Sequence, residues 1–152
     1  EQVYTLLHAF SDPLSLDTFR VITILQGKAY KHELHIACVN GYKYTEQLFA
    51  LPLESADAPS RCTDQEVEFL RVRQALSPGN FRMRPMSVSE WQRSNKRANN
   101  DFAYDVSVEE YQKAFEDKPL VGFTFQSDEV RRKTLVWSPT LGRIVNVEPE
   151  TP

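Results

Sequence analysis

The sequence predicts an α+β fold in which an antiparallel sheet of two meanders, able to curve into an open or half barrel, packs with two or three short helices. Runs rich in β-branched and aromatic residues, at 19–50 and 120–147, predict the meanders, and helix-start signals gather between them. The length of 152 residues, with 41% hydrophobic and 26% charged residues, is typical of one globular domain. We expect that domain to span residues 1–152, with a flexible tail at 148–152.

The first meander is predicted from three consecutive runs. Residues 19–25 (FRVITIL) are dense in β-branched side chains, which suit a buried pleated surface. Residues 30–39 alternate between two faces, and Asn40-Gly41 follows them. This dipeptide favours a two-residue type I′ hairpin, because both of its positions tolerate positive φ. Residues 42–50 should therefore return antiparallel and complete a three-stranded meander.

The middle of the chain carries three helix-start signals. Capping boxes, in which a Ser or Thr is followed three residues later by Glu, occur at 63–66, 87–90 and 107–110. Residues 64–76 leave two interpretations open. A helix beginning at the first box is favoured by Gln, Glu, Leu, Arg and Ala, whereas a strand here would pair with residues 81–86 as a hairpin.

The second meander is predicted at the end of the chain. Residues 120–126, 130–137 and 143–147 read as strands separated by polar turns. Residues 3–10 are short and apolar, and suit either a strand or a helix. We expect the two meanders to combine into one curved sheet packed on the helices between them.

Charge is unevenly distributed along the chain. The whole molecule has a formal net charge of −3, which does not favour nucleic acid as a partner. Residues 1–60 carry a net charge of −3, residues 61–100 of +4, and residues 101–152 of −4. The basic segment keeps nucleic-acid binding as an alternative. Cys38 and Cys62 form either one disulfide or two free thiols.

Four arginines in the basic segment are candidates for binding a ligand or partner. A hairpin over residues 69–86 would place Arg71, Arg73, Arg82 and Arg84 on one face, where guanidinium groups bind carboxylate or phosphate. On a helix, Arg71 and Arg73 would instead lie about 200° apart. Arg82 and Arg84 alternate on a short strand in either case, so we expect them to share a face away from the core.

A weaker candidate is an acid–base pair on the first meander. A two-residue turn pairs His35 with Glu46 across the strands, where a carboxylate can orient an imidazole. Tyr42 and Tyr44 would line the same face and hold a ring or sugar. The alternative interpretation is an ordinary surface pair. His32 should point to the opposite face from His35, so we expect no metal site there, and no phosphate-loop or dinucleotide motif predicts a cofactor.

These patterns favour a non-enzymatic binding or accessory module that recognises a protein partner or a small anionic or aromatic ligand. One alternative is a small enzyme that uses His35 and Glu46 in a sheet-lined pocket. Another is nucleic-acid binding through residues 61–100. No apolar run approaches the ~20 residues of a membrane span, and the cellular compartment stays open.

Overall fold

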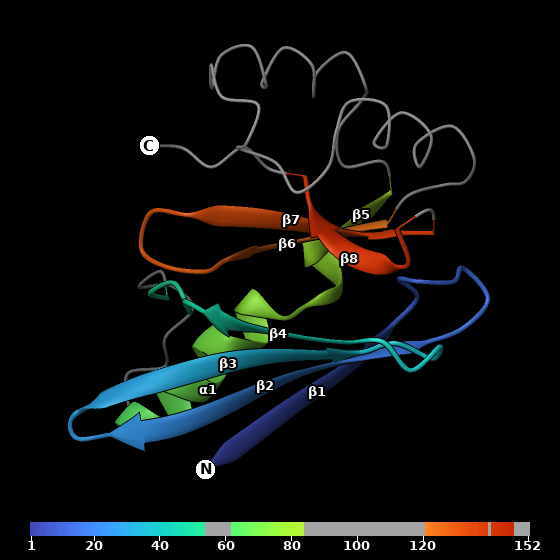
Figure 1. The fold of residues 1–152 in the computed structure, drawn as a ribbon. Helices are drawn as coiled ribbons and strands as arrows, with labels where there is room; N and C mark the ends of the chain where they lie inside the picture. The colour runs from blue at the N-terminus through green and yellow to red at the C-terminus, as the bar shows by residue number, and fades with distance from the viewer. Residues whose placement is uncertain (54–61, 84–120, 140, 148–152) are drawn as a thin grey trace.

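The fold is known from a computed structural model, which describes residues 1–53, 62–83, 121–139 and 141–147. This part of the chain forms eight strands, one α-helix and one 3-10 turn, and Figure 1 shows how the labelled strands and the helix are arranged. The elements are β1 Gln2–His8, β2 Asp17–Gln26, β3 Ala29–Ala37, β4 Lys43–Leu48, α1 Asp64–Ala75, η1 Pro78–Asn80, β5 Phe81–Met83, β6 Val121–Gln126, β7 Arg132–Ser138 and β8 Arg143–Asn146.

The strands form two four-stranded antiparallel sheets. The first sheet has the order β1-β2-β3-β4 and the second has the order β5-β6-β7-β8, so each is a simple meander. The predicted α+β class with antiparallel meanders is therefore confirmed. The described residues contain one α-helix instead of two or three, and the capping boxes at 87–90 and 107–110 lie outside them.

The expected single curved sheet is wrong, because the described strands form two separate sheets and no strand of one meander pairs with a strand of the other. The sheets meet where β4 ends, and there the backbone N–H of Phe49 donates to the carbonyl of Gln126 at 2.8 Å. A second link is the ion pair between Lys133 and Glu46, whose Nζ and Oε2 lie 2.7 Å apart.

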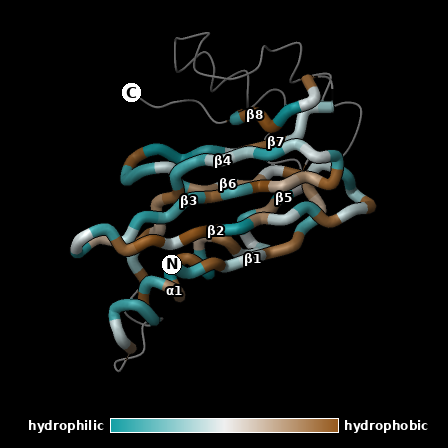
Figure 2. Tube along the Cα trace, turned by 60° about the horizontal axis from the view of Figure 1, so that its bottom comes forward, coloured by the Kyte–Doolittle hydropathy of each residue, from teal (hydrophilic) through white to brown (hydrophobic). Residues whose placement is uncertain are grey.

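The core lies between the sheets and the helix. Phe19, fully buried on β2, packs its ring 4.8 Å from that of Phe81 and 5.1 Å from that of Phe123. Phe123 and Phe125 share a face of β6, as their alternation predicts, with ring centroids 5.6 Å apart. Hydrophobic and hydrophilic residues interchange along the strands (Figure 2), which fits sheets that each bury one face against a neighbour.

The helix forms where its capping signal predicts it. Thr63 is the N-cap, and its hydroxyl accepts a hydrogen bond from the backbone N–H of Glu66 at 3.2 Å. Val72 and Leu76 are buried, and the ring of Phe69 packs edge-on against that of Tyr4 at 5.9 Å. The helix covers one face of the first sheet and leads directly into the second (Figure 1). The hairpin alternative for residues 64–76 is wrong.

The turn between β3 and β4 differs from the predicted type I′ hairpin. The loop has three residues, 39–41, and is closed by bonds from Cys38 N to Tyr42 O (2.8 Å) and from Gly41 N to Cys38 O (2.9 Å). Gly41 has φ of 94°, and a three-residue loop of this kind needs a glycine at its last position. The register therefore shifts by one residue, which exchanges the two faces of β4.

A fully buried carboxylate ties this turn to the loop that precedes β2. Asp17 accepts hydrogen bonds from the backbone N–H of Ser11 (2.6 Å), the Ser11 hydroxyl (3.0 Å) and the N–H of Val39 (2.9 Å). Burial, together with the negative charge of Asp17, raises the pKa of the nearby Cys38 thiol to about 11. Cys38 and Cys62 are both free thiols, so the disulfide alternative is wrong.

Replacement of Asp17 by Ala should destabilise the fold by about 3 kcal/mol, because three donors would lose their buried acceptor. Urea unfolding followed by tryptophan fluorescence measures this loss. Asp12→Ala is the matched control, since Asp12 accepts one bond from the exposed N–H of Leu14 and its loss should cost under ~1 kcal/mol. Equal losses in the two variants would contradict the structural role given to Asp17.

Candidate ligand-binding cleft

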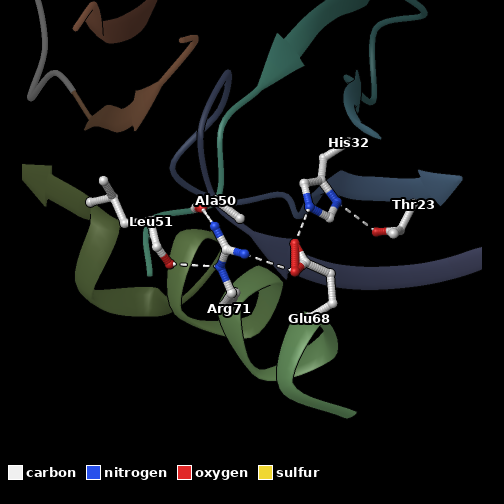
Figure 3. Close-up of polar contacts among 6 residues, drawn as sticks. All are labelled: Thr23, His32, Ala50, Leu51, Glu68 and Arg71. Carbon is white, nitrogen blue, oxygen red and sulfur yellow. Dashed lines mark hydrogen bonds and ion pairs between the residues drawn. The ribbon is translucent and has the colours of Figure 1, made fainter. Parts of the chain in front are cut away.

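A buried carboxylate joins the helix to the first sheet. Glu68 accepts hydrogen bonds from Nε2 of His32 and from Nη1 of Arg71, each at 2.9 Å (Figure 3). The other ring nitrogen of His32 lies 2.8 Å from the hydroxyl of Thr23. Because a carboxylate only accepts, Nε2 of His32 carries a hydrogen and donates it to Glu68, and Nδ1 forms the second bond of the ring, with the hydroxyl of Thr23.

Arg71 extends this network to the chain segment that follows β4. Its Nε donates to the carbonyl of Leu51 at 3.1 Å, and its Nη2 donates to the carbonyl of Ala50 (Figure 3). These bonds and the one to Glu68 use three of the five N–H donors of the guanidinium. The side chain is fixed by contacts from two directions, and its position follows from the docking of the helix.

The hydrogen bonds link a hydroxyl, an imidazole and a carboxylate in the sequence Thr23, His32, Glu68. The same sequence of groups activates catalytic hydroxyls in enzymes. Their residues are only 5%, 5% and 6% exposed. A substrate would have to displace the helix to reach the hydroxyl. We therefore interpret this trio as a link that holds the helix against the sheet.

A cleft of about 380 Å³ opens beside Arg71, where the two sheets and the helix meet. It lies between the end of β4, the C-terminal half of α1, the turn η1, and the facing ends of β6 and β7. The polar side of its lining is formed by Arg71, Gln74, Asn80, Thr124, Gln126 and Arg132. The apolar side is formed by Phe49, Leu51, Ala75 and Phe125.

Backbone contacts hold the walls of the cleft in place. The side-chain amide of Asn80 donates to the carbonyl of Thr124 at 3.2 Å, and its oxygen accepts from the Ser77 hydroxyl at 2.7 Å. The bond from Phe49 to Gln126 fixes the opposite side. Gln126 and Arg132 face each other in the register of β6 and β7. These contacts join the described segments that line the cleft.

The lining of the cleft is polar on the side of Arg71, whose charge is paired with Glu68. Two guanidinium groups and three carboxamides line it, and its described lining contains no carboxylate. The oxygen Oε1 of Gln126 is buried and has no hydrogen-bond partner among the residues that the structure describes.

The three candidate arginines that the structure describes, Arg71, Arg73 and Arg82, do not form one site. Arg71 lines the cleft, and Arg73 is exposed on the helix with its guanidinium 6.0 Å from the centre of the Phe69 ring. Arg82 is exposed on β5, as expected for the face opposite the partly buried Phe81. Arg84 lies outside the described residues. Neither Arg73 nor Arg82 lies beside Arg71 among the residues that line the cleft.

The predicted pairing of His35 with Glu46 is wrong, because the three-residue loop shifts the register. His35 pairs with Thr45, and its Nε2 lies 2.7 Å from Oε1 of Glu33. Glu46 pairs with Leu34 on the opposite face. The acid–base pair of the enzyme alternative therefore does not form in this structure.

The two tyrosines also lie on the face opposite His35. Tyr44 donates to Glu46 at 3.3 Å, and the ring of Tyr42 packs edge-on against Trp137 at 5.3 Å. Both tyrosines pack against the hydrophobic core. His32 and His35 lie on opposite faces of β3, as predicted, with His32 buried and His35 part-exposed.

Sequence reasoning missed the carboxamides of the cleft and Arg132. The predicted turn after residue 126 places Gln126 and Arg132 on adjoining strand ends, so the sequence pattern could have indicated that these two residues lie side by side. No sequence pattern indicated Asn80 or Gln74, because only the packing of the helix against the second sheet brings these residues to β6. Glu68 and His32 were also missed, since charged and polar residues in a helix or strand normally face solvent.

Comparison with known proteins gave no match to a family model, a curated protein or a solved structure. In the part of the chain that the structure describes, no cluster of three or more His, Cys, Asp or Glu side chains is placed to hold a metal ion. No helix among the described residues has the length and apolar character needed to cross a membrane.

Replacement of Glu68 by Ala should cost about 3 kcal/mol or more of unfolding free energy, because it leaves the Arg71 charge and the His32 ring without their shared acceptor. Glu66→Ala, an exposed change on the same helix, should cost under ~1 kcal/mol. Chemical unfolding of both variants measures the difference. A Glu68 variant as stable as the Glu66 variant would show that the buried network does not hold the helix.

Proposed function

We propose that this chain is a non-enzymatic binding module that holds a small anionic ligand with an apolar portion in the cleft between its sheets. The observation that carries the proposal is the set of residues that line the cleft, which combines guanidinium groups with aromatic rings. Arg71 and Arg132 line the cleft together with Phe49 and Phe125, and the described lining residues include no carboxylate. Guanidinium groups form strong charge-assisted bonds with carboxylates and phosphates.

The size and position of the cleft support the same function. A volume of about 380 Å³ falls in the range of small-molecule sites, roughly 300–1,000 Å³. Such sites form preferentially where separate structural layers meet, and they combine an apolar wall with a few fixed polar groups. Because Arg71 is held by Glu68 and two carbonyls, binding would cost little ordering of that side chain.

Benzoate is a suitable probe, because it carries one negative charge on an aromatic ring. We expect benzoate to shift the side-chain amide resonances of Gln74, Asn80 and Gln126 in ¹H–¹⁵N spectra, and to bind more tightly than neutral benzamide. Arg132→Gln should weaken benzoate binding about tenfold, because a charge-assisted bond contributes about 1.5 kcal/mol or more.

Arg131→Gln is the matched control. Arg131 is the neighbouring residue, is 57% exposed, and pairs with Asp128 at 3.6 Å outside the cleft. This variant should bind benzoate as the unaltered protein does. The proposal fails if benzoate leaves the cleft amides unperturbed, if benzamide binds as well as benzoate, or if the two arginine variants lose affinity equally.

A further inference from the structure

We propose that β1 is an interaction edge, at which a second copy of this chain adds its own β1 in antiparallel orientation. The strand lies at the margin of the first sheet, and β2 is the one described strand that pairs with it (Figure 1). A strand at a sheet edge presents a row of backbone donors and acceptors that another strand can use. This edge is separate from the cleft, because none of the residues that line the cleft belongs to β1.

The hydrogen-bond pattern of the first sheet determines which residues of β1 have their backbone groups on the open side. A two-residue turn joins β2 to β3, so Gln26 and Ala29 exchange both of their backbone hydrogen bonds. Bonding pairs then alternate along the ladders, and the even-numbered residues of β1 bond to the odd-numbered residues of β2. The backbone N–H and C=O groups of Val3, Thr5 and Leu7 therefore point away from the sheet.

The strand β1 has none of the features that usually protect a sheet edge. Edges are commonly blocked by charged side chains, proline, a bulge or a very short strand. β1 has seven residues (QVYTLLH), none of them Lys, Arg, Asp, Glu or Pro, and its register with β2 is unbroken. The other described edges differ: β5 has only three residues, β8 begins with Arg143, and β4 carries Lys43 and continues into the bond from Phe49 to the second sheet.

The outward-facing residues of β1 are self-complementary, which favours a second copy of the chain as the partner. In an antiparallel pair centred on Thr5, this residue stands opposite Thr5 of the second copy, and Val3 stands opposite Leu7 of the second copy. Each outward N–H then meets a C=O. Threonines are favourable cross-strand neighbours, and a strand without charged side chains does not repel its own copy. Val3 and Leu7 are 49% and 54% exposed, so their contact would bury apolar surface.

Both faces of the first sheet extend this contact. On the outer face, Ile22 lies beside Val3 in the register, so Leu7 of the second copy would continue an apolar row. On the inner face, Tyr4 would stand opposite Leu6 of the second copy, and both residue types already pack against the core of their own chain. The pairing would join the first sheets of two chains through a twofold axis, which is the commonest symmetry of protein dimers.

Sedimentation velocity of the full chain tests this pairing at concentrations from roughly 10 μM to 1 mM, because two short strands bury little surface and should associate weakly. We expect an equilibrium between monomer and dimer. Thr5→Lys and Thr5→Glu should each weaken the dimer about tenfold or more, because like charges would stand opposite each other. An equimolar mixture of the two variants should associate at least as tightly as the unaltered chain, because unlike charges would then face each other.

Thr45→Lys is the matched control. Thr45 is exposed and lies in the same cross-strand row as Thr5, on the opposite edge strand of the first sheet. This variant should associate as the unaltered chain does. ¹H–¹⁵N spectra establish that each variant folds.

Hydrogen exchange on the unaltered chain gives a measurement that needs no variant. The amide hydrogens of Val3, Thr5 and Leu7 should exchange more slowly at the high concentration, whereas those of Lys43 and Gln47 on β4 should not change. Three results would overturn the proposed pairing: a chain that stays monomeric throughout this range, association that Thr45→Lys weakens as much as Thr5→Lys, or a mixture of the two Thr5 variants that does not recover association.

Discussion

The docking of α1 on the first sheet depends on the buried carboxylate of Glu68. A buried charge is tolerated only when its bonds are complete, and Glu68 completes them with His32 on the sheet and Arg71 on its own helix. The hydroxyl of Thr23 then forms the second hydrogen bond of the His32 ring. Because each partner is satisfied only in this arrangement, the network specifies one position of the helix, which burial of Val72 and Leu76 alone would define less sharply.

The position of the helix in turn creates the cleft. With α1 fixed, Arg71 reaches the carbonyls of Ala50 and Leu51, and the chain passes through η1 into β5 of the second sheet. The second sheet meets the first at the bond between Phe49 and Gln126, so the two ladders diverge there instead of merging. The space between them is lined by charged and amide groups, and two of these, Arg71 and Asn80, also hold the described elements together.

Most of the fold could be predicted from local patterns. Three local patterns predicted elements that the structure confirms: the alternation in β3, the β-branched run in β2 and the N-cap at Thr63. Each pattern depends only on residues that are close together in the sequence. The register after Asn40 could not be predicted, because two- and three-residue loops share an Asn-Gly signal and differ only in which residues close them. That single-residue difference removed the predicted pair of His35 and Glu46.

The cleft was much less predictable than the fold. Its residues come from five separate segments that share no spacing, and Arg71 alone was identified, from its charge. The most direct test is to measure intermolecular nuclear Overhauser effects between bound benzoate and the protein. The ring protons should show contacts to the methyl group of Ala75 and the rings of Phe49 and Phe125, which line the cleft. Contacts to Phe69 and Leu70 on the outer part of the helix, without contacts to Ala75, would contradict the account.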